Sequence, residues 1–304
     1  MNRKKIPGLP TMGTLFRDSL KELVKNDPLR MAGATAFFTT FALPPILIIL
    51  IQIFKLVLDP GTIRVELYES LSGIVGPETV EQLTGVLTGL QRLAYNWYIT
   101  LGGFIFLLFV ATTLFKVIKN SLNQVWKIRP NNKKGIGKVV RARFHAVLVI
   151  VVAGVLFMIG LLAEALQAFI GSYIFEISPL FSIYFNTVIR HVISILIVTL
   201  WFMIMFRYLP DGRPAWGIAF TGALLTSVLF TLGKIVLHWL LSYSNINTLY
   251  GTSTSIVLLL LFVFYSSLIL YFGAAFTKIW GIYRNKPITP LPHAMHYRLI
   301  ETEV

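Results

Sequence analysis

The sequence predicts an all-α polytopic membrane protein with six transmembrane helices, and three observations support that fold class. Hydrophobic residues fill 56% of the 304 positions and charged residues only 13%, which is about half the charged share of a soluble domain. The mean hydropathy is +0.73. The apolar residues are gathered into long runs, whereas a membrane β-barrel shows short segments of alternating hydrophobicity.

Six runs of roughly 20 or more mostly apolar residues are candidate spans, since about 20 helical residues cross a hydrocarbon core of about 30 Å. A basic cytoplasmic tail over 1–31, with a short amphipathic helix around 15–24, is expected to precede them. The first thirty residues hold no apolar core, so no cleavable signal peptide is expected. A cytoplasmic tail over 281–304 is expected to follow the transmembrane domain. That domain covers 32–280, with spans at approximately 32–57, 99–118, 145–170, 186–206, 216–241 and 254–280.

Lysine and arginine are distributed unevenly between the two sets of loops. Residues 1–31 carry seven of them and residues 116–143 carry nine with no acidic residue, while 58–98 carries two and both 171–185 and 242–253 carry none. Cytoplasmic loops are enriched in these residues. We therefore expect both termini in the cytoplasm and the protein in the bacterial inner membrane.

The net charge of +14 has two interpretations. Membrane topology together with attraction to anionic headgroups at the cytoplasmic face accounts for it. Nucleic-acid binding is the other interpretation, but the 116–143 loop lacks the interleaved aromatic residues or motif that would favour it. We expect membrane lipids as partners and no nucleic acid, and we keep an envelope protein or a second copy of this chain as further partners to test.

The loop over 58–98 is the largest extramembrane segment between two predicted spans. Apolar residues recur in it at helical spacing, and Pro77 precedes Glu78 and Glu81 as at the first turn of a helix. We expect one or two amphipathic helices at the outer surface. Such helices either cap a cavity or rest on the membrane.

The first predicted span contains "AFFTTFALPPILIILIQIF", with Pro44 and Pro45 near its middle. Proline frees a backbone carbonyl and bends a helix, which is tolerated in a membrane where neighbours or cavity water satisfy the backbone. Interrupted helices in transporters often mark a substrate site near the midplane. The pair predicts either a kink that shapes a pocket for substrate or lipid, or a packing kink without a ligand.

Polar side chains inside the spans suggest a candidate site in the outer half of the membrane. Ionisable groups in a bilayer are costly and therefore often functional. Glu164 and Lys234 lie at similar predicted depth and are expected to form a charge pair. The candidate cavity or transport residues are Pro44, Pro45, Gln52, Glu164, Arg190, His191, Lys234 and His238.

Long basic side chains also have a simpler explanation, since Arg190 and Lys234 can extend to the outer headgroups. Glu164 is too short to reach far, so the cavity hypothesis depends on it most. The small-residue groups Gly222-Ala223 and Gly273-Ala274-Ala275 are expected to permit close helix contacts rather than to bind a ligand.

Four segments of the chain carry a family resemblance. They are "AGATAFFTTFALPPILI", "ATTLFKVIKNSLNQVWKI", "YLPDGRPAWGIAFTGALL" and "LYGTSTSIVLLLLFVFYSSLILYFGAAF". Together they resemble the YihY/virulence factor BrkB family of bacterial inner-membrane proteins, once labelled ribonuclease BN, and the resemblance extends from about residue 30 to 280. Many members carry a glutamate after the last Gly-Ala pair, where this chain has Ala275, so no role of that acid can be transferred.

The residues give no support to the old ribonuclease label. Phosphodiester hydrolysis usually needs clustered carboxylates and histidines that hold metal ions, but the four aspartates are scattered and the five histidines form no HxH or HxxxH group. No Gly-rich phosphate loop or GxSxG motif is present. The absence of cysteine excludes disulfides and thiol chemistry. We therefore predict no catalytic residues, no bound metal and no cofactor.

Three function classes remain. A transporter or lipid-handling protein is favoured by the prolines in the first span and by the polar cluster. A non-transporting scaffold in envelope assembly or resistance is favoured by the amphipathic outer loop. A membrane-bound hydrolase is disfavoured by the scattered acids.

Overall fold

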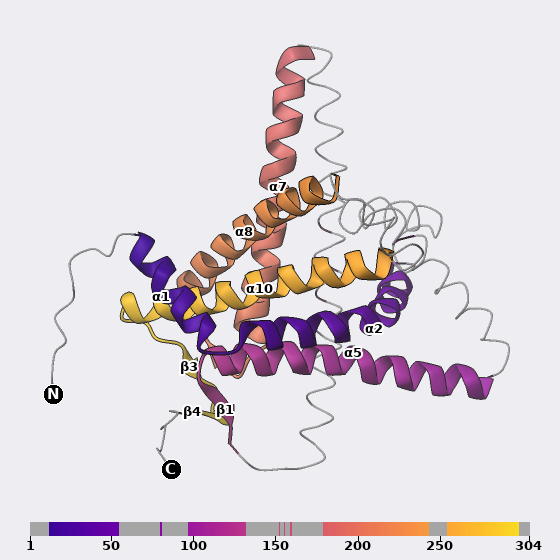
Figure 1. The fold of residues 1–304 in the computed structure, drawn as a ribbon, viewed down its shortest axis with the longest axis horizontal. Coiled ribbons are helices and arrows are strands. Elements are labelled where there is room, and N and C mark those ends of the chain that lie inside the picture. The colour runs from indigo at the N-terminus through magenta and orange to yellow at the C-terminus, as the bar shows by residue number, and fades with distance from the viewer. Residues whose placement is uncertain are drawn as a thin grey trace.

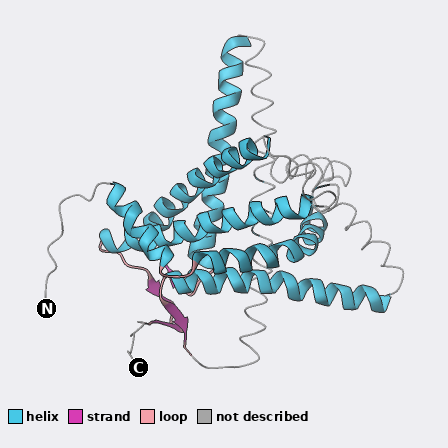
Figure 2. Ribbon diagram, viewed as in Figure 1, coloured by secondary structure: helices cyan, strands magenta, loops and turns pink. Residues whose placement is uncertain are grey.

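The computed structural model describes residues 12–54, 80, 97–131, 152, 155, 159, 179–242 and 254–297. Most of these residues are helical (Figures 1 and 2). The helices are α1 (Met12–Val24), α2 (Pro28–Phe54), α5 (Trp97–Val125), α7 (Pro179–Tyr208), α8 (Trp216–Ser242) and α10 (Thr254–Tyr283). The strands are β1 (Ile128–Pro130), β2 (Gly212–Arg213), β3 (Thr289–Pro290) and β4 (Ala294–His296).

The long helices coincide with predicted apolar runs. α2, α5, α7, α8 and α10 cover the first, second, fourth, fifth and sixth of them. The run over 145–170 and the 58–98 loop lie almost entirely outside the described residues. By length and composition, two described segments are apolar enough to cross a membrane, Trp216–Leu237 and Ile256–Tyr283. The mostly helical fold class is therefore confirmed.

Two small antiparallel sheets were not predicted. β1 pairs with β4, which sets Arg129 opposite Met295, and β2 pairs with β3, which sets Arg213 opposite Thr289. Both pairings join a turn between helices to the segment after α10. That segment was expected to be a tail, and instead it folds back onto the helices as far as residue 297.

Three helices are followed, within two or three residues, by a residue with positive φ. Asp27, Lys127 and Asn285, with φ of 53°, 55° and 55°, follow α1, α5 and α10. A left-handed residue reverses the chain and lets the next N–H groups reach the last free carbonyls of the helix. Accordingly, the backbone N–H of Lys286 donates to the carbonyl of Gly281 at 2.8 Å. Pro28 then opens α2, because its fixed φ suits a first helical turn.

The described helices pack as a series of neighbours. α2 lies between α5 and α10, α10 also packs against α8, and α8 packs against α7. α1 lies on α10, where Phe16 contacts Phe272 and Phe276 with ring centroids 5.7 and 5.9 Å apart. The helix predicted near 15–24 is therefore confirmed, and it is held against the bundle rather than forming part of a free tail.

One end of the molecule gathers α1, the C-terminal ends of α5 and α10, the first turn of α8 and the strands (left in Figure 1). The fully buried Trp126, Phe206, Tyr271 and Phe276 belong to segments that meet there. The indole N–H of Trp126 donates to the carbonyl of Ala274 at 2.9 Å. We call this end the basic end, defined by Lys119, Lys127, Arg207, Arg213, Lys278 and Lys286.

α8 and α10 cross at two matched pairs of glycine and threonine. A Cβ on Gly222 would collide with the Thr277 hydroxyl, and a Cβ on Gly273 would collide with the Thr226 hydroxyl. Each threonine hydroxyl donates to the carbonyl four residues earlier, which is Gly222 for Thr226 and Gly273 for Thr277. Small residues let helix backbones approach closely in a membrane. The predicted close-contact role of these glycines is confirmed.

Gly222→Ala is expected to destabilise the protein by about 1–3 kcal/mol, the usual cost of forcing an extra methyl group into a packed interior. The midpoint of thermal unfolding in detergent measures the loss. Gly217→Ala is the matched control on the same helix, because a Cβ there meets no heavy atom within 4 Å. An unchanged midpoint for Gly222→Ala would contradict the close crossing.

Candidate functional site

The predicted outer cavity is described only in part. Pro44, Pro45 and Gln52 lie on α2, and the helix continues through both prolines to Phe54. Figure 1 shows the axis of α2 changing direction in its C-terminal half. The prolines therefore do not end the helix, and a bend accompanies them. The side chains of these three residues lie outside the described part.

The described part of the structure does not show the ionisable residues of the predicted cavity in contact with one another. Glu164 lies outside them, and Arg190, His191 and His238 are placed only by their backbone on α7 and α8. Lys234 is half-buried on α8, and its Nζ lies 5.6 Å from the ring centroid of Phe230. The pairing of Glu164 with Lys234 and the cavity itself stay predictions.

An apolar groove of about 350 Å³ lies between α2 and α10. Every lining residue is apolar: Gly33, Ala36, Phe37, Val257, Leu260, Leu261 and Phe264. A Cβ on Gly33 would meet no heavy atom within 4 Å, so this glycine leaves open space in the groove. Phe37 on its edge is 55% exposed. The groove thus opens to the surroundings of the bundle.

The outer faces of the helices are strongly apolar. On α8 the exposed side chains include Leu232, Ile235, Val236 and Trp239, of which the last two are 62% exposed. Large contiguous apolar surfaces are rare on soluble monomers and mark membrane or partner contact. These faces suit a lipid environment.

A buried carboxylate joins three distant segments at the basic end. The Asp211 side chain in the turn between α7 and α8 is only 3% exposed. Its Oδ1 lies 2.7 Å from Lys119 Nζ and 3.0 Å from His293 Nε2, and its Oδ2 accepts from Asn123 Nδ2 at 2.8 Å. The Asp211 N–H donates to Asn123 Oδ1, and the Asp211 carbonyl accepts from the Leu291 N–H, each at 2.8 Å.

The charge of Asp211 is stabilised by this network. Burial by itself raises the pKa of this carboxyl, but the hydrogen bond and charge of Lys119, together with the hydrogen bonds from His293 and Asn123, outweigh burial. The pKa of Asp211 is thereby lowered below 3.8. Hydrogen bonds to a carboxylate favour its ionised form. Asp211 therefore acts as a fixed negative charge that holds the α5 end, the turn and the returning segment.

A second set of contacts holds α1 and the start of α2. Lys278 Nζ lies 2.6 Å from Glu22 Oε1 and donates to the Val125 carbonyl at 2.9 Å. Lys127 Nζ donates to Asn26 Oδ1 at 2.9 Å. Burial lowers the pKa of Lys127, against the opposing effect of Glu22. These bonds connect the N-terminal helix to the ends of α5 and α10.

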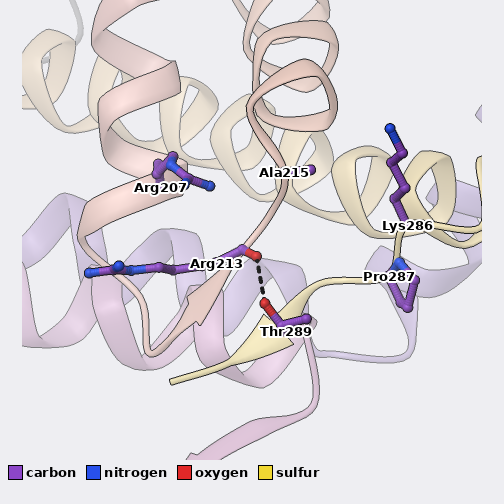
Figure 3. Close-up of a pocket in the computed structure, with 6 residues that line it drawn as sticks. All are labelled: Arg207, Arg213, Ala215, Lys286, Pro287 and Thr289. Atoms are coloured by element: carbon purple, nitrogen blue, oxygen red, sulfur yellow. Dashed lines mark hydrogen bonds between the residues drawn. The ribbon is translucent and has the colours of Figure 1, made fainter. Parts of the chain in front are cut away.

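A basic pocket of about 470 Å³ lies beside this network (Figure 3). The Arg207 guanidinium donates to the Pro214 carbonyl and lies 4.4 Å from the ring centroid of Trp216. The Thr289 hydroxyl donates to the Arg213 carbonyl at 3.2 Å, which ties the turn to β3. Arg207, Arg213, Ala215, Lys286, Pro287 and Thr289 line the pocket.

Sequence reasoning treated Asp211 as a turn residue and His293 as part of a tail, so it missed their contact. One signal was available: Asp211 is an acid between Arg207 and Arg213, and the 116–143 loop is rich in cations with no acidic residue. Among the described residues, no three His, Cys, Asp or Glu side chains gather as metal ligands would.

A mostly helical chain with apolar outer faces and one basic end is the arrangement of a helical membrane protein. The family model described as Virulence factor BrkB matches residues 19–296. This chain belongs to the Virulence factor BrkB family, as its motifs indicated.

Its relatives are named as membrane proteins. The chain is 23% identical to a UPF0761 membrane protein of Saccharophagus degradans over 90% of this chain and 60% of the relative. It is 22% identical to one of Ralstonia nicotianae over 91% of this chain and 61% of the relative. It is 24% identical to a UPF0761 membrane protein of Actinobacillus pleuropneumoniae over 84% of this chain and 88% of the relative. The chain thus spans about three fifths of the first two relatives. No solved structure matches it significantly.

Asp211→Asn is expected to lower the stability of the protein at pH 7 by about 3–5 kcal/mol, the usual cost of removing one partner of a buried ion pair, because Lys119 and His293 lose the charge they face. The ionised carboxylate makes its full contribution to the free energy of unfolding above pH 3.8, the ordinary pKa of an aspartate. That contribution is lost as the pH falls through the pKa of Asp211 in the folded protein, which is lower. The difference between the two proteins should therefore shrink below pH 3.8. Thermal unfolding midpoints measured from pH 7 downward test this.

Asp18→Asn is the matched control, since Asp18 pairs with Arg17 at 3.7 Å on an exposed surface. Such pairs contribute little. Equal losses for the Asp18 and Asp211 variants, or a loss at Asp211 that does not depend on pH, would contradict the buried network.

Proposed function

We propose that this chain is a six-span protein of the bacterial inner membrane with both termini in the cytoplasm, and that it moves membrane lipid between the leaflets. The orientation is supported by the gathering of the described basic segments at one end, as the rule for cytoplasmic loops requires.

The apolar groove between α2 and α10 is the observation that carries the lipid proposal. All of its lining residues are apolar, and the exposed Phe37 and Leu261 on its rim face the surroundings of the bundle. Sites for polar solutes carry placed polar groups that fix orientation. A lining of hydrocarbon alone suits an acyl chain.

The bend in α2 supports movement rather than static binding. The helix that forms one wall of the groove at Gly33, Ala36 and Phe37 also carries Pro44 and Pro45 further along. Proline removes a backbone hydrogen bond and weakens the helix at that point. A wall that bends there can open or close the groove while α10 stays fixed against α8.

A non-transporting envelope scaffold is the second candidate, and the position of α1 favours it. This helix lies on α10, while Lys21 in its last turn and Lys25 just after its end are exposed. An exposed basic segment attracts an acidic partner. This candidate requires a bound envelope protein and no lipid movement.

Liposomes that contain the purified protein are expected to move a phosphatidylcholine analogue with a dye on a short acyl chain faster than empty liposomes. Reduction of outer-leaflet dye by dithionite measures the movement. Gly33→Leu should slow it several-fold, because a Cβ at this position meets open space and the rest of the new side chain would occupy the groove.

Gly13→Leu is the matched control on α1, where a Cβ also meets no heavy atom within 4 Å. It should leave the rate unchanged. No acceleration by folded wild-type protein would overturn the lipid-moving proposal, and equal rates for the Gly33 and Gly13 variants would remove the groove from it.

A further inference from the structure

The basic pocket combines three cations with well-held neighbours. Arg207 comes from the end of α7, Arg213 from β2 and Lys286 from the turn after α10. Figure 3 shows Arg207 and Arg213 on one side and Lys286 on the other, with Ala215 between Arg207 and Lys286 and the Thr289 to Arg213 hydrogen bond below. No acidic residue lines the pocket. Its chemistry is that of an anion site.

The nearest acid in the chain does not neutralise the pocket. Asp211, two residues before Arg213, is buried, and its carboxylate is already engaged by Lys119, His293 and Asn123. The side chains of Arg213 and Lys286 are exposed. Their charges therefore remain available to an anion from outside.

The Arg207 side chain is held in place before any ligand arrives, by its bond to the Pro214 carbonyl and by stacking on Trp216. At Lys286 it is the backbone that is fixed, since this residue directly follows the left-handed Asn285 and its backbone N–H donates to the Gly281 carbonyl. A pre-ordered donor such as Arg207 binds a ligand at lower entropic cost.

The first turn of α8 adds a further attraction for an anion. Ala215, which lines the pocket, accepts the first intrahelical bond from the Ala219 N–H, so the N–H groups of residues 216–218 precede the helical ladder. These groups and the helix dipole favour negative charge at this point. They reinforce the three cations.

Two exposed aromatic residues lie beside the pocket. Tyr208 and Trp216 are 50% and 51% exposed, and their rings lie 6.2 Å apart between the end of α7 and the start of α8. Exposed tyrosine and tryptophan concentrate at the boundary between headgroups and hydrocarbon. This pair therefore favours a lipid phosphate as the anion.

We propose that the pocket formed by Arg207, Arg213 and Lys286 binds the phosphate of an anionic phospholipid of the cytoplasmic leaflet. This inference rests on the proposed function for the orientation of the chain. It deepens that function by naming the lipid class that the basic end selects. Arg207 and the α8 N-terminus hold the phosphate, while Arg213 and Lys286 favour a headgroup with net negative charge.

Titration of phosphatidylglycerol into the detergent-solubilised protein, with the thermal unfolding midpoint as readout, tests the site. Phosphatidylglycerol should stabilise the wild-type protein at lower concentration than phosphatidylcholine does. The double variant Arg213→Gln with Lys286→Gln should bind phosphatidylglycerol about tenfold more weakly, since each cation near an anionic lipid typically contributes several-fold in affinity.

The double variant Lys21→Gln with Lys25→Gln removes the same charge at the end of α1 and should change the affinity little. An equal loss in both double variants would overturn the site, as would equal binding of the two lipids by wild-type protein. Displacement of the lipid by millimolar inorganic phosphate would show a free-anion site and overturn the lipid assignment.

The outcome is separable from that of the proposed function. The movement assay uses phosphatidylcholine alone, so it does not require the basic pocket. Selective binding without lipid movement overturns the transport proposal and upholds the site. Lipid movement with no preference for phosphatidylglycerol upholds the transport proposal and overturns the site.

Discussion

A carboxylate buried in an apolar bundle must be neutralised, and the way Asp211 is neutralised organises one whole end of this molecule. Its partners Lys119, Asn123 and His293 come from 82 to 92 residues away along the chain. Removing one member of a buried ionic network leaves a costly unpaired charge. The three segments are therefore held together as a unit, and β1 to β4 extend that unit away from the helices.

The rigidity of the basic end contrasts with the groove between α2 and α10. At the basic end, Lys278 and Trp126 bind backbone carbonyls of neighbouring helices. At the groove, α2 and α10 present only apolar side chains, and α2 bends in its C-terminal half. A bundle anchored at one end and adaptable along one seam suits a protein that holds a headgroup while an acyl chain moves.

The sequence predicted the long helices that the structure describes and close helix contacts at Gly222 and Gly273, because long apolar runs and paired small residues are local patterns. It did not predict the contacts of Asp211, since these depend on how the segment after α10 folds back. The outer cavity was harder to derive for another reason. In a membrane helix both the lipid-facing and the core-facing sides are apolar, so the pattern does not show which way Arg190, Lys234 and His238 face. Their convergence stays a prediction.

The side of the membrane that the basic end faces is the most direct test of this account. The chain has no cysteine, so single-cysteine variants can be labelled with a membrane-impermeant maleimide without background. Lys286→Cys should react only after the cells are lysed, whereas Asn247→Cys, between the fifth and sixth predicted spans, should react in intact spheroplasts. Labelling of Lys286→Cys in intact spheroplasts, with Asn247→Cys protected until lysis, would contradict the account.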